Sequence, residues 1–248
     1  MTVVLVHGNP ETAAIWGPLI AALDRTDIVT LSPPGFGAPL PDGFGATHQD
    51  YRDWLVNELT ELGESVDLVG HDWGGGHVMN AVIHRPELVR SWATDALGLF
   101  DPEYVWHDLA QVWQTPGAGE ELVEQMLGGS VEDRTESLVG LGFPADVAAQ
   151  VAAGQDDAMA RAIPLLYRSA VPPGLDEARA NLPNAAARPG LSILATEDPY
   201  TGSAELRRRA AERAGADTAV LDGLGHWWML EDPQRAAAAL TGFWDSLA

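Results

Sequence analysis

The stretch LVGHDWGGGHV, residues 68–78, decides the fold expected for this chain of 248 residues. Its apolar start and its glycines outline a buried strand, a tight turn and the beginning of a helix. In a G-x-S-x-G elbow, this outline lifts a serine nucleophile above the carboxyl edge of a parallel sheet. The raised position here is Asp72, between Gly70 and Gly74. A carboxylate therefore stands where a hydroxyl nucleophile is usual.

The rest of the chain alternates between short Val- and Leu-rich runs and stretches of helical periodicity. The runs end at Gly, Pro or Asp, as buried parallel strands do. Six strands are expected, at 3–7, 28–32, 66–71, 89–95, 191–196 and 218–222. Four helices are expected between and after them, at 12–23, 48–62, 74–84 and from Pro233 onward. This alternation predicts an α/β fold with a mostly parallel, doubly wound sheet.

One interval, residues 99–189, breaks the alternation. It contains helical pieces punctuated by Pro and Gly, such as EYVWHDLAQVW and DDAMARAIPLLYRSA, and no clear strand. The alternative is a set of peripheral helices, but the length of the interval between two strands favours an inserted cap. We therefore expect a core made of residues 1–98 and 190–248, with a helical cap at 99–189.

Charge and composition exclude several classes of function. The formal net charge is −22, so the surface repels phosphate backbones and anionic lipid, and we expect neither nucleic acid nor membrane as a partner. Without Cys there is no thiol nucleophile or disulfide, and all 14 cationic residues are Arg, which excludes Schiff-base chemistry on Lys. No cofactor is expected, and the histidines lack metal-site spacing, so no metal is expected either. A small apolar substrate fits this composition best.

The start of the chain, MTVVLVHGNP, reads as a strand that begins at once. It has no basic segment, long apolar run or cleavage site, which predicts a cytoplasmic location. No stretch approaches the length of a transmembrane helix. The sequence leaves the oligomeric state open, a homodimer included.

Asp72 determines the chemistry that the turn predicts. Its carboxylate is ionised at neutral pH and can displace a leaving group from an sp³ carbon, which leaves an alkyl ester on the enzyme. Water must then hydrolyse that ester, which requires a general base and donors for the tetrahedral oxyanion. The backbone N–H groups of Trp73 and Asn9 are the expected donors. The substrate should therefore carry a saturated electrophilic carbon rather than a carboxylic ester.

The base and its acid partner are expected at the ends of the last two strands. His226 follows the last strand, and the order nucleophile, acid, base along the chain is that of Ser-Asp-His elbow enzymes. Asp198 follows the preceding strand and is the favoured acid. Glu197 is its close rival, and Asp95, at the end of an earlier strand, is a weaker one.

Three motifs, VHGNP, GHDWGG and GHWWMLEDP, resemble those of α/β-hydrolases with an aspartate nucleophile, namely epoxide hydrolases and haloalkane dehalogenases. The resemblance covers nearly the whole chain and begins at the strand that is third in that family. It implies an α/β-hydrolase fold with about six strands, shortened at its N-terminal edge, and an inserted helical cap. It also implies that Asp72, Asp198 and His226 form a catalytic triad.

Residues of the cap distinguish epoxide hydrolases from haloalkane dehalogenases. When an epoxide opens, an acid must protonate the alkoxide that is formed. In epoxide hydrolases two cap tyrosines do this. The segments QVWQTPGAGEEL and LLYRSA resemble that cap, which implies that Tyr167 is one acid. The second tyrosine would fall near Leu109, where this chain has none, and Tyr104 and His107 lie nearby. The cap resemblance favours an epoxide hydrolase that forms vicinal diols.

The alternative is a haloalkane dehalogenase, in which a halide leaves as an anion and needs only donors. The resemblance supplies them as Asn9 and the Trp73 indole. A third and weaker reading is a non-catalytic ligand-binding protein on the same scaffold. In each case an apolar pocket is expected under the cap, lined by Trp106, His107, Leu109, Trp113, Trp227 and Trp228.

Overall fold

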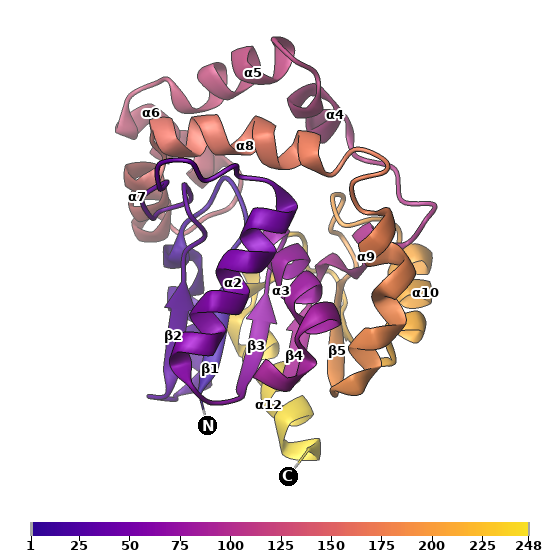
Figure 1. Ribbon diagram of the computed structural model, residues 1–248. Coiled ribbons are helices and arrows are strands. Elements are labelled where there is room, and N and C mark those ends of the chain that lie inside the picture. Colours follow the sequence, from indigo (N-terminus) through magenta and orange to yellow (C-terminus); the bar gives the residue numbers. More distant parts are fainter. Residues whose placement is uncertain (1, 248) are drawn as a thin grey trace.

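The computed structural model describes residues 2–247, and its centre is one parallel sheet covered on both faces by helices (Figure 1). The predicted strands are all present: β1 (Val3–Val6), β2 (Ile28–Leu31), β3 (Val66–Gly70), β4 (Val89–Thr94), β5 (Gly190–Ala195) and β6 (Ala216–Leu221). They pair in the order β2-β1-β3-β4-β5-β6. The doubly wound parallel sheet of six strands is thereby confirmed.

The inner strands of the sheet are buried on both faces. Every residue of β1 and β3 is buried, as parallel strands between two helix layers require. The chain runs outward from β1 to β2 and then returns to place β3 on the other side of β1, where Val6 pairs with Gly70. Loops after β1 and β3 therefore diverge, and a crevice for ligands forms at such a switch point.

Two helix layers enclose the sheet. One contains α2 (His48–Leu62), α3 (Trp73–His84) and α10 (Ala204–Ala214), and the other contains α1 (Gly17–Leu23) and α12 (Pro233–Ser246). Helix α2 has the predicted bounds because Thr47 and Asp50 form a capping box at its start. Short helices η2 (Pro86–Leu88) and α11 (Trp228–Glu231) complete the loops.

The segment expected as one helix at 12–23 is divided, and that prediction was wrong in this detail. A 3₁₀ turn, η1 (Ala13–Trp16), precedes α1. Pro18 occupies the first turn of α1 and has no N–H to donate to the carbonyl four residues back, so the α-helical ladder cannot cross this point.

The helical interval forms a layer above the carboxyl ends of the strands (Figure 1). This layer, called the cap below, consists of α4 (Asp108–Gln114), α5 (Ala118–Leu127), α6 (Val131–Gly140), α7 (Ala145–Gly154) and α8 (Asp157–Ser169). The elements on either side of it, η3 (Ala96–Phe100), α9 (Asp176–Asn181) and η4 (Leu182–Ala187), pack against α3. The domain boundaries at 98 and 189 stay a prediction. Within the described chain, no helix combines the length and apolar character that a membrane crossing needs.

His77 lies in the middle of α3, where it is stacked between two aromatic rings. Its ring centroid is 4.7 Å from that of Tyr51 and 5.8 Å from that of Trp73, and its Nδ1 has no hydrogen-bond partner. Burial, and to a smaller extent the nearby His48 and His7, lowers the pKa of His77 to about 3. The folded protein therefore keeps this imidazole neutral far below the pH at which an unfolded chain would protonate it.

We expect this neutral imidazole to make the fold sensitive to acid. Because the unfolded chain binds the proton near pH 6.5 and the folded chain only near pH 3, stability that is present above pH 6.5 is lost as the pH falls toward 3. His77 should account for about 2 kcal/mol of the loss between pH 7 and pH 5. Urea unfolding of His77→Phe, which preserves the stack, should show a correspondingly smaller loss than wild type. The exposed His84→Gln on the same helix is the control, and equal losses in all three proteins would contradict the account.

Candidate active site

Asp72 lies in the turn between β3 and α3, in the conformation of a nucleophile elbow. Its φ of 51° and ψ of −127° are costly for a residue with a side chain and are held only where the surroundings impose them. The Asp72 N–H donates to Oδ1 of Asp95 at 3.0 Å, and its carbonyl accepts the Gly76 N–H at 3.0 Å. Both bonds anchor the strained backbone, so the side chain projects over the sheet edge.

Glycines make room for this turn. A Cβ at Gly70 would lie 2.6 Å from the Gly74 carbonyl oxygen, and a Cβ at Gly74 would meet the backbone of β1 and His7. A Cβ at Gly8, in the loop after β1, would lie 2.5 Å from Cβ of Asp72 and would overlap its Oδ2. The loop after β1 can therefore contact the Asp72 carboxylate directly only because Gly8 has no side chain.

The carboxylate of Asp72 has two oxygens in different surroundings. Oδ2 accepts the backbone N–H of Asn9 at 3.1 Å, while Oδ1 lies 3.9 Å from Nε2 of His226. Its side chain is 16% exposed, and loss of solvation raises the pKa of Asp72 to about 6, against the opposing effects of His226 and His71. At neutral pH the group is ionised and poorly solvated, which suits a nucleophile.

The His226–Asp198 pair forms as expected. Nδ1 of His226 lies 3.1 Å from Oδ2 of Asp198, whose two oxygens also accept the Tyr200 N–H at 2.8 Å and the Thr201 hydroxyl at 2.9 Å. Burial acts against charge on Asp198, but His226 and these donors hold its pKa well below the usual range. Burial is likewise the largest effect on His226 and acts to lower its pKa, but the charge and hydrogen bond of Asp198 together with the charge of Asp72 make the net shift upward. Glu197 is exposed, and its Oε1 accepts the hydroxyl of the adjacent Thr196 at 3.5 Å.

A second buried cluster lies below the nucleophile, and sequence reasoning missed it. His71 bridges two carboxylates, with Nδ1 2.5 Å from Oδ2 of Asp95 and Nε2 3.3 Å from Oε1 of Glu11. The Trp228 indole donates to Asp95 at 2.7 Å, and the Trp227 indole donates to Glu11. Although burial opposes it, these two carboxylates raise the pKa of His71 well above its ordinary value. Asp95 is therefore the hydrogen-bond partner of His71, and it does not orient His226.

Glu11, His71 and His226 bring ligand atoms within 4.8 Å of one another, so they are the residues that could hold a metal. Both ring nitrogens of His71 and Nδ1 of His226 already face carboxylates. A metal would have to displace these bonds, so the arrangement fits a hydrogen-bonded network better. The absence of a metal stays a prediction.

The cavity beside Asp72 has two parts, called the small chamber and the large limb. The small chamber, of about 20 Å³, is lined by Asp72, Trp73, Ala96, Leu99, Tyr104, Trp106, His107, Tyr167, Tyr200 and Thr201. The large limb, of about 100 Å³, is lined on its cap side by Leu109, Trp113, Met126, Leu138, Leu141 and Phe143. Asn9, Glu11, His226 and Trp227 line its catalytic end. The predicted pocket residues line one of the two parts with the exception of Trp228, which is fully buried and whose indole donates to Asp95.

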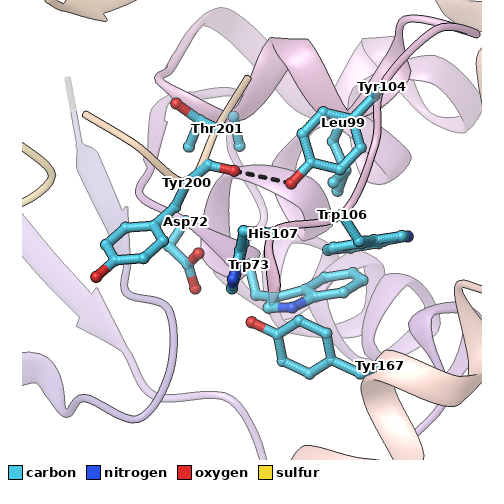
Figure 2. A pocket seen from close by; sticks show the side chains of 10 residues that line it. Asp72, Trp73, Leu99, Tyr104, Trp106, His107, Tyr167, Tyr200 and Thr201 are labelled. Atoms are coloured by element: carbon cyan, nitrogen blue, oxygen red, sulfur yellow. Dashed lines mark hydrogen bonds between the residues drawn. The ribbon is translucent and has the colours of Figure 1, made fainter. Parts of the chain in front are cut away.

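The cap brings two polar groups to the nucleophile. Figure 2 shows the Tyr167 hydroxyl and the His107 ring in the space beside the Asp72 carboxylate. Burial, and next the charge of Asp72, raises the pKa of Tyr167 well above its usual value, so its proton is retained. The hydroxyl of Tyr104 is already used, since it donates to the Tyr200 carbonyl at 2.8 Å. Leu109 contributes only apolar wall.

His107 has its tautomer set by the start of α4. Its Nδ1 accepts the Ala110 N–H at 3.2 Å, so the proton of a neutral ring lies on Nε2. Burial, followed by the charge of His226, lowers the pKa of His107 and favours this neutral form. The ring packs edge-on against Tyr200, with centroids 5.0 Å apart. His107 is therefore held as an N–H donor.

The chain belongs to the α/β hydrolase family, which matches residues 3–239. A haloalkane dehalogenase from Mesorhizobium japonicum is 31% identical over 140 residues, which are 49% of this chain and 42% of that protein. An epoxide hydrolase from Caballeronia sordidicola is 28% identical over 102 residues, 36% of this chain and 29% of that protein. A protein described as uncharacterized carboxylesterase nap, from Bacillus subtilis, is 33% identical over 94 residues, 36% of this chain and 31% of its own length. The matches thus span less than half of each relative.

Solved structures agree over the whole chain. Haloalkane dehalogenase DbeA from Bradyrhizobium elkani has a TM-score of 0.71 at 21% identity, with 99% of this chain and 91% of that chain covered. Cfl2 from Burkholderia cenocepacia has a TM-score of 0.76 at 22% identity, with 98% and 87% covered. These likenesses establish the α/β-hydrolase fold, and the chemistry has to be argued from the site.

The contact between Gly8 and Asp72 gives a steric test of the elbow. Gly8→Ala should destabilise the protein by about 1–3 kcal/mol, because the new methyl group must displace the Asp72 side chain or the loop. Gly242→Ala is the control: this glycine is exposed in α12 with no atom within 4 Å of an added Cβ, so alanine should stabilise by about 0.5–1 kcal/mol. Urea unfolding at pH 7 measures both. Wild-type stability in Gly8→Ala would show that the two loops are not in contact.

Proposed function

We propose that the protein is an epoxide hydrolase that converts an epoxide to a vicinal diol through an alkyl ester on Asp72. The observation that carries the proposal is the Asp72 carboxylate itself, poorly solvated in the elbow, with His226 on one side and the protonated Tyr167 on the other. A serine esterase mechanism has no hydroxyl at this position to use.

In the first step Oδ1 of Asp72 attacks a ring carbon of the epoxide. The carbon–oxygen bond of the ring breaks, and its electron pair passes to the departing oxygen. Oδ2 remains in contact with the Asn9 N–H and becomes the carbonyl oxygen of the new ester. The Tyr167 hydroxyl gives its proton to the alkoxide, and the Nε2–H of His107 donates a hydrogen bond to the same oxygen. His107 thereby takes the place that a second tyrosine has in related caps.

In the second step Nε2 of His226 removes a proton from water, and the water oxygen adds to Cγ of Asp72. Asp198 orients the ring through Nδ1 and stabilises the imidazolium. The oxyanion forms on Oδ2, against the Asn9 N–H, where such a donor is typically worth about 3 kcal/mol in the transition state. The ester bond then breaks, and the departing alkoxide takes the proton held on His226 and leaves as the diol. Asp72 retains the oxygen that came from water and, as a carboxylic acid, returns its proton to the Tyr167 phenolate.

The second candidate is haloalkane dehalogenation, and one observation favours it. The Asn9 side-chain amide is buried, lines the large limb and makes no hydrogen bond of normal geometry within the described chain, although it interacts with the Tyr167 hydroxyl and opposes the rise in the pKa of that group. An amide N–H so weakly engaged beside Asp72 could hold a departing halide. The retained proton on Tyr167 has no use in that reaction, which is why the epoxide hydrolase is preferred.

Trapping the ester tests the proposal and separates the candidates. His226→Gln should form the ester but hydrolyse it at least ~10³-fold more slowly, because the base is lost. Intact mass spectrometry should then show this variant heavier by the full mass of the epoxide, since no atom leaves. A 1-haloalkane would instead add only its alkyl group and release halide, which ion chromatography detects.

Two controls accompany this experiment. His84→Gln, on the exposed side of α3, should turn over normally and accumulate no adduct. Asp72→Asn should neither turn over nor gain mass. Turnover of an epoxide by wild type without any adduct in His226→Gln would contradict the proposal.

A further inference from the structure

Asp72 stands where two very different cavities meet. Four side chains, those of Asp72, His107, Tyr167 and Tyr200, line both the small chamber and the large limb. A substrate carbon bonded to Asp72 therefore has one substituent facing each cavity. The volumes, about 20 Å³ and about 100 Å³, and the walls of these cavities decide what each substituent can be.

Stacked aromatic rings close the small chamber. The indoles of Trp73 and Trp106 are stacked with centroids 5.7 Å apart, and Tyr104 packs edge-on against Trp106 at 5.2 Å. The bond from the Tyr104 hydroxyl to the Tyr200 carbonyl fastens this wall to the loop after β5. Figure 2 shows these rings gathered on one side of Asp72. Such a wall cannot expand, so the chamber accepts only a small substituent.

The large limb has walls of another kind. Near Asp72 it passes between aromatic pairs, with Trp113 against Tyr167 at 4.7 Å and Phe143 against Trp227 at 4.8 Å. Farther out the walls are the side chains of Met126 on α5, Leu138 on α6 and Leu141 in the turn after α6. Leu141 is 57% exposed, so this end of the limb reaches the surface of the cap.

Charge is confined to the catalytic end of the limb. Asp72, Glu11 and His226 lie there, and none of the cap residues that line it is charged. The limb therefore offers no cation for an anionic tail, and the net charge of −22 adds a general repulsion of anions. Its occupant must be apolar and neutral along its length.

We propose that the large limb binds a neutral, unbranched aliphatic chain carried by the substrate, while the small chamber holds hydrogen or a group of about methyl size. The substrate class, a terminal or near-terminal aliphatic epoxide, rests on the proposed function. The chain lies from Asp72 outward past Met126 and Leu138 toward Leu141. Each methylene added within the limb is removed from water.

Binding to an inactive protein tests the limb without requiring turnover. Primary n-alkanols from butanol to decanol are titrated into Asp72→Asn by calorimetry. Affinity should rise about fourfold per methylene until the limb is full and then level off. Branched alkanols and n-alkanoates of equal carbon number should bind at least tenfold more weakly than the longest n-alkanols. Affinity that is independent of chain length would overturn the proposal.

A pair of neighbouring substitutions on α5 locates the binding site. In the Asp72→Asn background, Met126→Glu places a carboxylate in the limb and should flatten the dependence on chain length. Gln125→Glu adds the same charge one residue away, at an exposed position outside the limb, and should leave the dependence intact. Met126→Leu should restore it. An unchanged dependence in Met126→Glu would place the chain elsewhere and overturn the proposal.

The proposed chain-binding role of the large limb and the proposed reaction can be contradicted by different results. If alkanols show the chain-length dependence but no epoxide forms an adduct in His226→Gln, the limb is supported and the reaction is wrong. If epoxides are hydrolysed by the wild type with no preference for longer chains between 1,2-epoxybutane and 1,2-epoxydecane, the reaction stands and the limb proposal is overturned.

Discussion

The Asp72 carboxylate, carried on a backbone with φ of 51° and placed where loss of solvation raises its pKa to about 6, is the constraint on which the rest of the structure depends. Strand β3 and helix α3 produce the bend, and Gly8, Gly70 and Gly74 leave the space that it needs. A charge held with little water near it costs free energy that the fold must supply. The neighbouring positive charge and hydrogen-bond donor stabilise the carboxylate and offset part of that free energy.

Two histidines near Asp72 differ in how many of their ring nitrogens are engaged by carboxylates. His226 faces Asp72 and is oriented by Asp198, and its Nε2 remains free of a close partner. His71 lies with its ring centroid 4.5 Å from that of His226, but both of its nitrogens are engaged by carboxylates. With a raised pKa, His71 places a fixed positive charge under the elbow, which opposes the rise in the pKa of Asp72. One histidine is thus free to exchange protons and the other is not.

Local sequence was enough to predict the sheet, the elbow and the proximity of Asp72, Asp198 and His226, because each depends on residues that are adjacent or at fixed places after strands. The choice between Glu197 and Asp198 needed the structure, in which Glu197 is exposed and only Asp198 is buried against His226. Glu11 was missed because its indole partner lies 216 positions away. Its place in the loop after the first strand, beside the predicted Asn9, is the signal that could have identified it. The sequence also could not identify His107 as the second cap donor, because its tautomer depends on the hydrogen bond that its Nδ1 accepts at the start of α4.

The central claim is that Asp72 bonds to carbon before water takes part, and the fate of the water oxygen tests it most directly. With enzyme in excess over an epoxide, one turnover in heavy-oxygen water should place the label in the Asp72 carboxylate and leave the diol unlabelled. Peptide mass spectrometry of the segment around residue 72 reads the first, and mass analysis of the diol reads the second. Label in the diol with none in Asp72 would mean that water attacks the epoxide directly, which contradicts the account.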